Sequence, residues 1–347
     1  MGPSSFRPLQ APIVALAHAA MGWLVSQQEA DGNIVPAVDP WTSLPRYDPV
    51  RSSFAAGAMA AYLLTHPRSD AQYLVSVRRH IQYQAARLER PGVPRDPLEY
   101  CYAGEEALTL WELTAERAFL KLAVRWGTLL RRYDLTAGGP LLSQHAATLL
   151  LRLAAHRSDV RKDAVFMAEH ALREFESLRT RDTPMPLAHF AELVNVMVLL
   201  ADVTADPRHN HAALAVADWL LSFRRPSGSL TDVPFPYTAA GGVAYASATA
   251  KIIEILPLAI RAATTAGQIP DPYQAGLDEA IVSLAPLQYD AENTYGISPA
   301  IRAQLIGGVR NHARLIRADV DTVGHLLLGL SRLLQAATHV RRRRHES

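Results

Sequence analysis

The chain has 347 residues, 49% of them hydrophobic, and a formal net charge of +2. This length can build one large domain or two ordinary ones around a sizeable core, and so small a charge gives no general attraction to nucleic acid. A single cysteine, Cys101, excludes an internal disulfide framework and a multi-cysteine zinc site. Because no signal peptide and no stretch of about 18 apolar residues is visible, we expect a cytoplasmic protein without a membrane span.

Hydrophobic periodicity predicts twelve helices in an Ala- and Leu-rich chain. In chain order they cover 11–28, 50–65, 69–90, 103–114, 116–133, 143–156, 159–179, 187–202, 207–225, 243–264, 271–288 and 319–337. The segment 289–318 is ambiguous and is compatible with short extra helices. We expect one domain over 1–338, followed by a basic tail over 339–347. Short basic tails are usually solvated, and contact with an anionic partner is the alternative.

The links between the predicted helices alternate in length. Links after odd-numbered helices are long or rich in Gly and Pro, and links after even-numbered helices are short. In an up-and-down array, alternate links lie at opposite ends, so all the long loops gather at one end. Binding and catalytic residues tend to lie on such loops.

Internal repeats support a regular array. The segment 23–34 aligns without gaps on 219–230, and 114–117 resembles 204–208 at an equivalent short link. Even-numbered helices are apolar almost throughout, as in 54–64, whereas odd-numbered helices carry a charged face, as in 78–90. Because helices that are apolar all round are buried, we predict an all-α (α/α)6 toroid of six helical hairpins, with an inner ring of apolar helices.

The segments from Trp23 to Gly32 and from Tyr102 to Leu110, with the Thr-Ala-Glu/Asp turns, resemble the six-hairpin glycosidase-like superfamily. The resemblance implies a toroid that acts as a glycoside hydrolase, a sugar epimerase or a related lyase. A weaker resemblance links the first segment to terpene cyclases and protein prenyltransferases. With only Cys101 available, the zinc site of the prenyltransferases is missing, and Asp319-Val320-Asp321-Thr322 lacks the full acidic motif of class II terpene cyclases.

The first turns of the even-numbered helices are polar or aromatic, and on this prediction they line the mouth of the toroid. Hydrolysis of a glycosidic bond commonly uses two carboxyl groups across a cavity. The carboxyl candidates are Asp48, Glu105 or Glu106, Glu192, Asp319 and Asp321. We favour Glu105 as the proton donor, because burial would raise the pKa of its carboxyl group, with Asp48 or Asp319 as its partner.

Each of these carboxylates also has an ordinary structural explanation as a helix-start charge that pairs with an arginine, and helix N-capping is a further explanation for Asp48, Ser143 and Asp319. His145 and His189 fit either a base pair for epimerisation or hydrogen-bonded core positions. Helix N-termini together with nearby arginines would favour an anionic group on the substrate. The residues expected to bind substrate are Trp41, Arg46, Tyr47, Arg51, Tyr100, Tyr102, Gln144, His145, Tyr237, Tyr245 and Asp321.

Three functions stay open at this point. The first is a carbohydrate-active enzyme that acts on a small-molecule or oligosaccharide substrate. A glycoside hydrolase is favoured over an epimerase or a lyase. The second is a terpene-cyclase-like enzyme in which Asp319 or Asp321 protonates an isoprenoid. The third is a non-catalytic binding or accessory toroid. We expect neither a metal nor an organic cofactor, because no ligand spacing or phosphate-binding loop is present.

Overall fold

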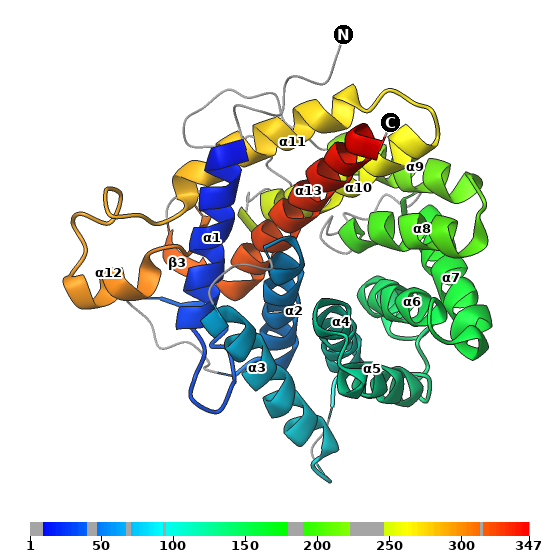
Figure 1. The fold of residues 1–347 in the computed structure, drawn as a ribbon, viewed down its shortest axis with the longest axis horizontal. Coiled ribbons are helices and arrows are strands. Elements are labelled where there is room, and N and C mark those ends of the chain that lie inside the picture. The colour runs from blue at the N-terminus through cyan, green and yellow to red at the C-terminus, as the bar shows by residue number, and fades with distance from the viewer. Residues whose placement is uncertain are drawn as a thin grey trace.

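The computed structural model describes residues 10–39, 47–66, 71–92, 95–179, 190–222, 246–312 and 315–346. Inner helices form a ring around its centre (Figure 1). They are α2 (Pro49–Thr65), α4 (Pro97–Thr114), α6 (Gly139–Ala154), α8 (Ala191–Thr204), α10 (Ala246–Thr265) and α13 (Val320–Glu346). Each contacts the next one along the ring, and α13 contacts α2, so the ring is closed.

The outer helices cover this ring. Each packs against the inner helix that precedes it across a short link, except α1, which packs against α13 and α2. They are α1 (Gln10–Ser26), α3 (Ala71–Glu89), α5 (Arg117–Leu130), α7 (Arg161–Arg179), α9 (Arg208–Ser222) and α11 (Asp271–Leu284). A short 3-10 turn, Ser158–Val160, precedes α7, and another, Ala285–Leu287, follows α11. The predicted (α/α)6 toroid is therefore confirmed. Because inner and outer helices alternate along the chain, the inner helices run parallel and begin at the same end.

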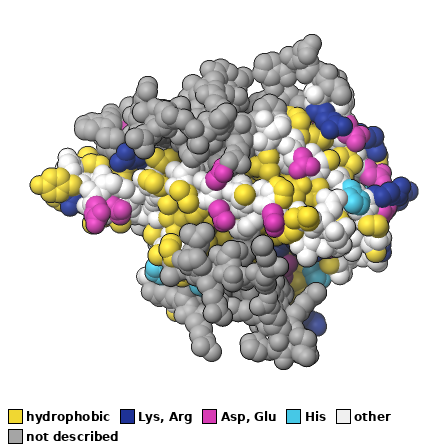
Figure 2. Space-filling model, turned by 90° about the horizontal axis from the view of Figure 1, so that it is seen from above, with side chains coloured by type: hydrophobic (Ala, Val, Ile, Leu, Met, Phe, Trp, Pro, Cys, Tyr) yellow, Lys and Arg dark blue, Asp and Glu magenta, His cyan; other side chains and the backbone are white. Residues whose placement is uncertain are grey.

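Exposed large apolar side chains among the described residues come from several different elements. Val75 on α3, Phe166 on α7 and Val282 on α11 are exposed on different helices. The side of the molecule drawn in Figure 2 likewise shows apolar and acidic side chains interspersed. Scattered apolar residues of this kind need no partner. Within the described ranges, no helix is long and apolar enough to cross a membrane.

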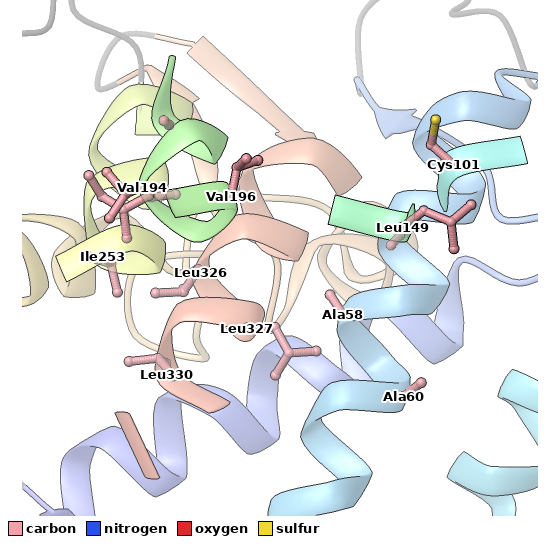
Figure 3. Close-up of a cluster of buried hydrophobic side chains, with 14 of the residues drawn as sticks. Ala58, Ala60, Cys101, Leu149, Val194, Val196, Ile253, Leu326, Leu327 and Leu330 are labelled. Atoms are coloured by element: carbon pink, nitrogen blue, oxygen red, sulfur yellow. The ribbon is translucent and has the colours of Figure 1, made fainter. Parts of the chain in front are cut away.

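Burial follows the division into two rings. On α6 every residue from Leu142 to Leu151 is buried, whereas on α3 burial recurs every three or four residues. Figure 3 shows side chains from different inner helices, among them Val194 of α8, Ile253 of α10 and Leu326 of α13, in one apolar cluster. The inner helices are thus fixed by apolar packing, which holds the polar residues that they carry in defined positions.

The repeated Thr-Ala turns adopt the same conformation at two short links. Ala115 and Ala205 have left-handed backbones, with φ of 58° and 57°. In each turn the preceding threonine donates its hydroxyl to a carbonyl one turn back, from Thr114 to Leu110 (2.8 Å) and from Thr204 to Leu200 (2.7 Å). The sequence repeat therefore corresponds to a structural repeat.

Some boundaries differ from those expected. Helix α4 begins at Pro97 rather than at residue 103, because Asp96 accepts a hydrogen bond from the backbone at its start and Glu99 bonds back to Asp96, which forms a capping box. Helix α6 begins at Gly139, ahead of Ser143. Helix α13 continues to Glu346, so the described part of the basic tail prolongs an inner helix.

The ambiguous segment 289–318 contains the short helix α12 (Pro299–Leu305) and part of an unexpected sheet. Its antiparallel strands lie in the order β1 (Ala37–Val38), β3 (Leu315–Asp319), β2 (Arg310–His312). Ala37 pairs with Asp319 across β1 and β3, and the register between β2 and β3 is irregular. The sheet therefore connects the link after α1 to the start of α13.

Candidate active site

A cavity of about 390 Å³ lies inside the ring, and all six inner helices line it. On α4 the lining residues are Tyr102, Glu105, Thr109 and Glu112, whose spacing of three or four residues places them on one helix face. This row runs from the first turns of α4 to its last turn. The cavity therefore extends well beyond the ring of helix starts that the sequence pointed to.

The adjacent glutamates of α4 face in different directions. Glu105 lines the cavity, whereas Glu106 is fully buried and accepts a hydrogen bond from His80 Nδ1 of α3 at 2.9 Å. Beside them, Gly104 leaves room for the side chain of Leu149 on α6, because a Cβ there would lie only 2.6 Å from that leucine. Close packing of α4 on α6 thus sets the direction of Glu105.

Tyr102, His145 and Glu105 form a connected group on α4 and α6. The Tyr102 hydroxyl lies 2.8 Å from His145 Nε2, and His145 Nδ1 lies 3.9 Å from Glu105 Oε1. Burial and the nearby carboxylates of Asp321, Glu105 and Glu192 raise the pKa of Tyr102 well above its ordinary value. The phenol therefore keeps its proton across the neutral range.

Glu192, in the first turn of α8, has a carboxyl group buried in the cavity wall. Its Oε1 accepts hydrogen bonds from the Thr148 hydroxyl and the Asn195 amide, both at 2.7 Å. Burial is the main cause that raises the pKa of Glu192, and the charges of Glu254 and Glu105 add to this effect. His145 and Arg332 lower the pKa of Glu192, but it stays above its ordinary value. Glu192 is thus placed to hold a proton where an exposed glutamate would lose it.

Glu254, on α10, is the opposite case. Its carboxylate accepts a hydrogen bond from His325 Nδ1 and lies 3.1 Å from Arg332 Nη1, both on α13. Burial alone would raise the pKa of Glu254, but His325 and Arg332 lower it to about 2. Burial and Lys251 lower the pKa of His325, yet Glu254 and Asp321 outweigh them and raise it.

Asp321 belongs to this group although it does not line the cavity. Its Oδ1 lies 3.6 Å from His325 Nε2, and His325 holds the pKa of Asp321 well below its usual range despite the effect of burial. The ring of Phe54 packs on His325 with centroids 4.3 Å apart. His325, which the sequence analysis did not single out, is therefore fixed between two carboxylates and an aromatic ring.

The two carboxyl partners expected for Glu105 lie elsewhere. Asp48 caps α2 by accepting a hydrogen bond from the Arg51 backbone, and the two side chains form a partly exposed ion pair. Asp319, at the end of β3, pairs with Arg317 at 2.7 Å. Neither residue lines the cavity. Helix capping thus accounts for Asp48, and an ion pair accounts for Asp319.

Several residues expected to bind substrate also lie away from the cavity. Tyr47 is exposed and its hydroxyl accepts a hydrogen bond from Arg87, while Tyr100 is buried beside Tyr133. Gln144 is fully buried and is not part of the cavity lining. The remaining expected residues, Trp41, Arg46, His189, Tyr237 and Tyr245, lie outside the described residues.

Charged residues in the middle and last turns of the inner helices were not predicted from the sequence. Arg152, Glu254, Arg261 and Arg332 all line the cavity. A signal was available, because Glu254 interrupts the apolar run Ile252-Ile253-Glu254-Ile255-Leu256. A charge inside an otherwise buried helix requires a partner or a cavity. In the described part of the chain, no three His, Cys, Asp or Glu side chains form a group that could hold a metal ion.

No family model matches the sequence, and no curated protein matches it. The fold, however, is shared with solved structures. The α-1,6-mannanase GH76A of Salegentibacter sp. HEL1_6 aligns with a TM-score of 0.62 and 13% identity over 93% of this chain and 99% of that chain. An unsaturated glucuronyl hydrolase specific for heparin aligns with a TM-score of 0.69 and 11% identity over 94% and 98% of the two chains.

The unsaturated glucuronyl hydrolase of Bacillus sp. GL1 aligns over 92% of this chain and 96% of that chain, with a TM-score of 0.67 and 12% identity. The chain shares the (α/α)6 toroid fold of these solved structures. Identities this low establish the fold and leave the chemistry to be argued from the site itself.

Proposed function

We propose that the protein is a carbohydrate-active enzyme, a glycoside hydrolase whose active site is the cavity inside the ring. The observation that carries this proposal is the presence of Glu105, Glu192 and Glu254 on the wall of one cavity, where the pKa of Glu192 is raised and that of Glu254 is lowered. Carboxyl groups whose pKa values are driven apart are a mark of acid and base assignments. The solved toroids that the chain resembles include a mannanase and glucuronyl hydrolases, which is consistent with this chemistry.

In this proposal Glu192 is the proton donor and Glu105 the base. Glu192 has the raised pKa that a general acid needs, which is why we transfer the donor role from Glu105 to Glu192. As the bond between the anomeric carbon and the glycosidic oxygen breaks, Glu192 gives its proton to the departing oxygen. Glu105 takes a proton from the water whose oxygen forms the new bond to that carbon.

The two hydrogen bonds on Glu192 suit this role. Both the Thr148 hydroxyl and the Asn195 amide donate to Oε1. A protonated carboxyl group can therefore accept on Oε1 and carry its proton on Oε2. Glu254, in contrast, is occupied by His325 and Arg332, and we assign it to holding the cavity wall.

We propose a neutral oligosaccharide as the substrate. The arginines of the cavity wall each pair with a carboxylate, Arg152 with Glu112 and Arg332 with Glu254. Arg51, which supported an anionic substrate, pairs with Asp48. With these charges neutralised in pairs, the described part of the wall has no excess of positive charge to favour a uronate or a phosphate.

The isoprenoid alternative fits the cavity less well. An isoprenoid cyclase needs a dry, aromatic wall and a protonated aspartate, whereas Asp319 is paired with Arg317 and Asp321 is held in its ionised form by His325. Phe54 and Tyr102 are the aromatic residues among the described lining, in which four carboxylates, three arginines and two amides stand beside aliphatic side chains. A cytoplasmic location stays a prediction of the sequence.

The proposal is tested by incubating the protein with a panel of glycans and measuring new reducing ends. The panel includes α-1,6-linked mannooligosaccharides as neutral substrates and unsaturated uronyl oligosaccharides as anionic ones. Release of reducing ends from a neutral glycan supports the proposal. Binding without release, seen as a thermal shift alone, would instead favour a non-catalytic toroid.

A further inference from the structure

Two buried polar atoms face each other across part of the cavity without a hydrogen-bond partner. They are His145 Nδ1 and Glu105 Oε1, which lie 3.9 Å apart. This separation exceeds a hydrogen bond between nitrogen and oxygen. His145 is 7% exposed, and both residues line the cavity. Since an unpaired buried polar atom is costly, the pair is built to be completed by something else.

Tyr102 determines which nitrogen of His145 carries the hydrogen. The Tyr102 hydroxyl keeps its proton and lies 2.8 Å from His145 Nε2. No other hydrogen bond of this hydroxyl is present among the described residues, so the phenol proton is satisfied by donation to Nε2. A neutral imidazole has one bare nitrogen and one N–H. The hydrogen of His145 therefore lies on Nδ1, on the side of Glu105.

The space between these atoms selects the chemistry of its occupant. An atom about 2.8 Å from both of two atoms separated by 3.9 Å sees them at an angle of roughly 90°, which a hydroxyl oxygen tolerates. The occupant must accept a hydrogen from Nδ1 and donate one to the Glu105 carboxylate. A hydroxyl does both, whereas a carboxylate only accepts and an ammonium group only donates.

We propose that His145 and Glu105 together bind a hydroxyl oxygen, with Tyr102 as a positioning residue that fixes the His145 tautomer. Two sources supply this oxygen with the same chemistry, namely a sugar hydroxyl and the water that attacks the anomeric carbon. The catalytic meaning of the site rests on the proposed function. The hydrogen-bond arrangement itself does not.

The tautomer is tested on the protein without substrate. Imidazole 15N NMR distinguishes a protonated from a bare ring nitrogen, with the His145 signals assigned by comparison with a His145→Asn variant. At a pH where the ring is neutral, the account requires hydrogen on Nδ1 and a bare Nε2. Tyr102→Phe should reverse or mix the two forms. Hydrogen on Nε2 in the unsubstituted protein would overturn the inference, whatever the protein hydrolyses.

A matched pair of substitutions tests the hydroxyl site by kinetics. The amide nitrogen of asparagine lies close to the position of Nδ1, and that of glutamine close to Nε2. His145→Asn therefore keeps a donor toward Glu105, whereas His145→Gln keeps the contact to Tyr102 and loses that donor. We expect His145→Gln to lose at least roughly tenfold more kcat/KM than His145→Asn, the worth of a hydrogen bond to a polarised oxygen.

The same kinetic measurements distinguish the two sources of the bound oxygen. A sugar hydroxyl predicts a higher KM in His145→Gln, and the attacking water predicts a lower kcat at unchanged KM. Either pattern supports the site when circular dichroism shows that both variants are folded. Equal losses in the two folded variants contradict it. If no glycan is turned over, the proposed function fails while the 15N measurement still decides this inference.

Discussion

Arg332 Nη1 of α13 lies 3.1 Å from Glu254 Oε1 and 3.2 Å from the Glu254 carbonyl oxygen of α10. This arginine therefore joins two neighbouring inner helices at the wall of the cavity. With His325 on the other carboxylate oxygen, Glu254 is held in its ionised form in a place where burial alone would favour the neutral acid. The closure of the ring and the electrostatics of the cavity thus depend on the same contact.

Glu254→Gln should destabilise the protein at neutral pH. Its depressed pKa, about 2 in the folded protein, contributes stability above the ordinary pKa of 4.5, and this stability is lost as the pH falls between these two values. We expect a loss of roughly 3 kcal/mol at pH 7 and a clearly smaller one near pH 3, measured by urea unfolding.

The matched control is Asp202→Asn, which removes an ion pair with Arg261 in which both side chains are about half exposed. Its cost should be below about 1 kcal/mol. Equal losses in Glu254→Gln at pH 7 and pH 3 would show that the charge of Glu254 is not what stabilises this contact.

Gly329→Ala should destabilise the ring where α13 crosses α10. A Cβ at residue 329 would lie 2.6 Å from backbone atoms of Ile253 and Glu254, which cannot move aside as a side chain can. Gly57→Ala on α2 is the control, since nothing lies within 4 Å of its Cβ position and alanine favours helix by about 1 kcal/mol. Thermal unfolding should show a lower Tm for the first variant and an equal or higher Tm for the second. The reverse order would contradict this packing.

The fold was predictable because the helix pattern and the link lengths are local signals that agree with each other. Helix rotation is not local, so the sequence pattern alone does not determine which side chains face the cavity. Asp48 carries a capping signal that capping alone explains, whereas Glu254 lies deep in α10 and reaches the cavity only because of how α10 packs on α13. The sheet was missed since its strands are short and pair Ala37 with Asp319, far away in the sequence.

Glu106→Ala should destabilise the protein more than Glu106→Gln. Glu106, His80 and Ser52 form a fully buried chain of hydrogen bonds between α4, α3 and α2. Alanine leaves His80 Nδ1 unpaired, at a cost of about 1–3 kcal/mol, whereas glutamine still offers an acceptor. Chemical unfolding of the two variants tests this difference.

The pH dependence of the same variants carries a second check. Burial raises the pKa of Glu106, although His80 lowers it, so the stability from this group is full below its unfolded pKa and declines as the pH rises through the folded value. In Glu106→Gln, this decline of the free energy of unfolding with rising pH should disappear. Indistinguishable unfolding curves for the alanine and glutamine variants would remove this network from the account of stability.

Activity should fall on the alkaline side as Glu192 loses its proton. Because its pKa is raised, the donor stays protonated to higher pH than an exposed glutamate, and kcat/KM declines as the pH rises through that value. The charge of Glu254 helps to raise this pKa, so Glu254→Gln should move the decline to lower pH. Glu112→Gln, at the far end of the cavity lining, should leave it in place. A shift in the opposite direction in Glu254→Gln would argue against Glu192 as the titrating group.

The central claim is that Glu192 donates the proton and Glu105 acts as the base in the cavity, and comparing two leaving groups tests it most directly. On a natural glycan, Glu192→Gln and Glu105→Gln should each lower kcat by roughly 10²–10⁴-fold with the fold intact. On an activated aryl glycoside of the same sugar, whose leaving group needs no proton, Glu192→Gln should recover most of its activity while Glu105→Gln stays inactive. Equal losses of Glu192→Gln on both substrates, or undiminished turnover of the natural glycan, would contradict the account.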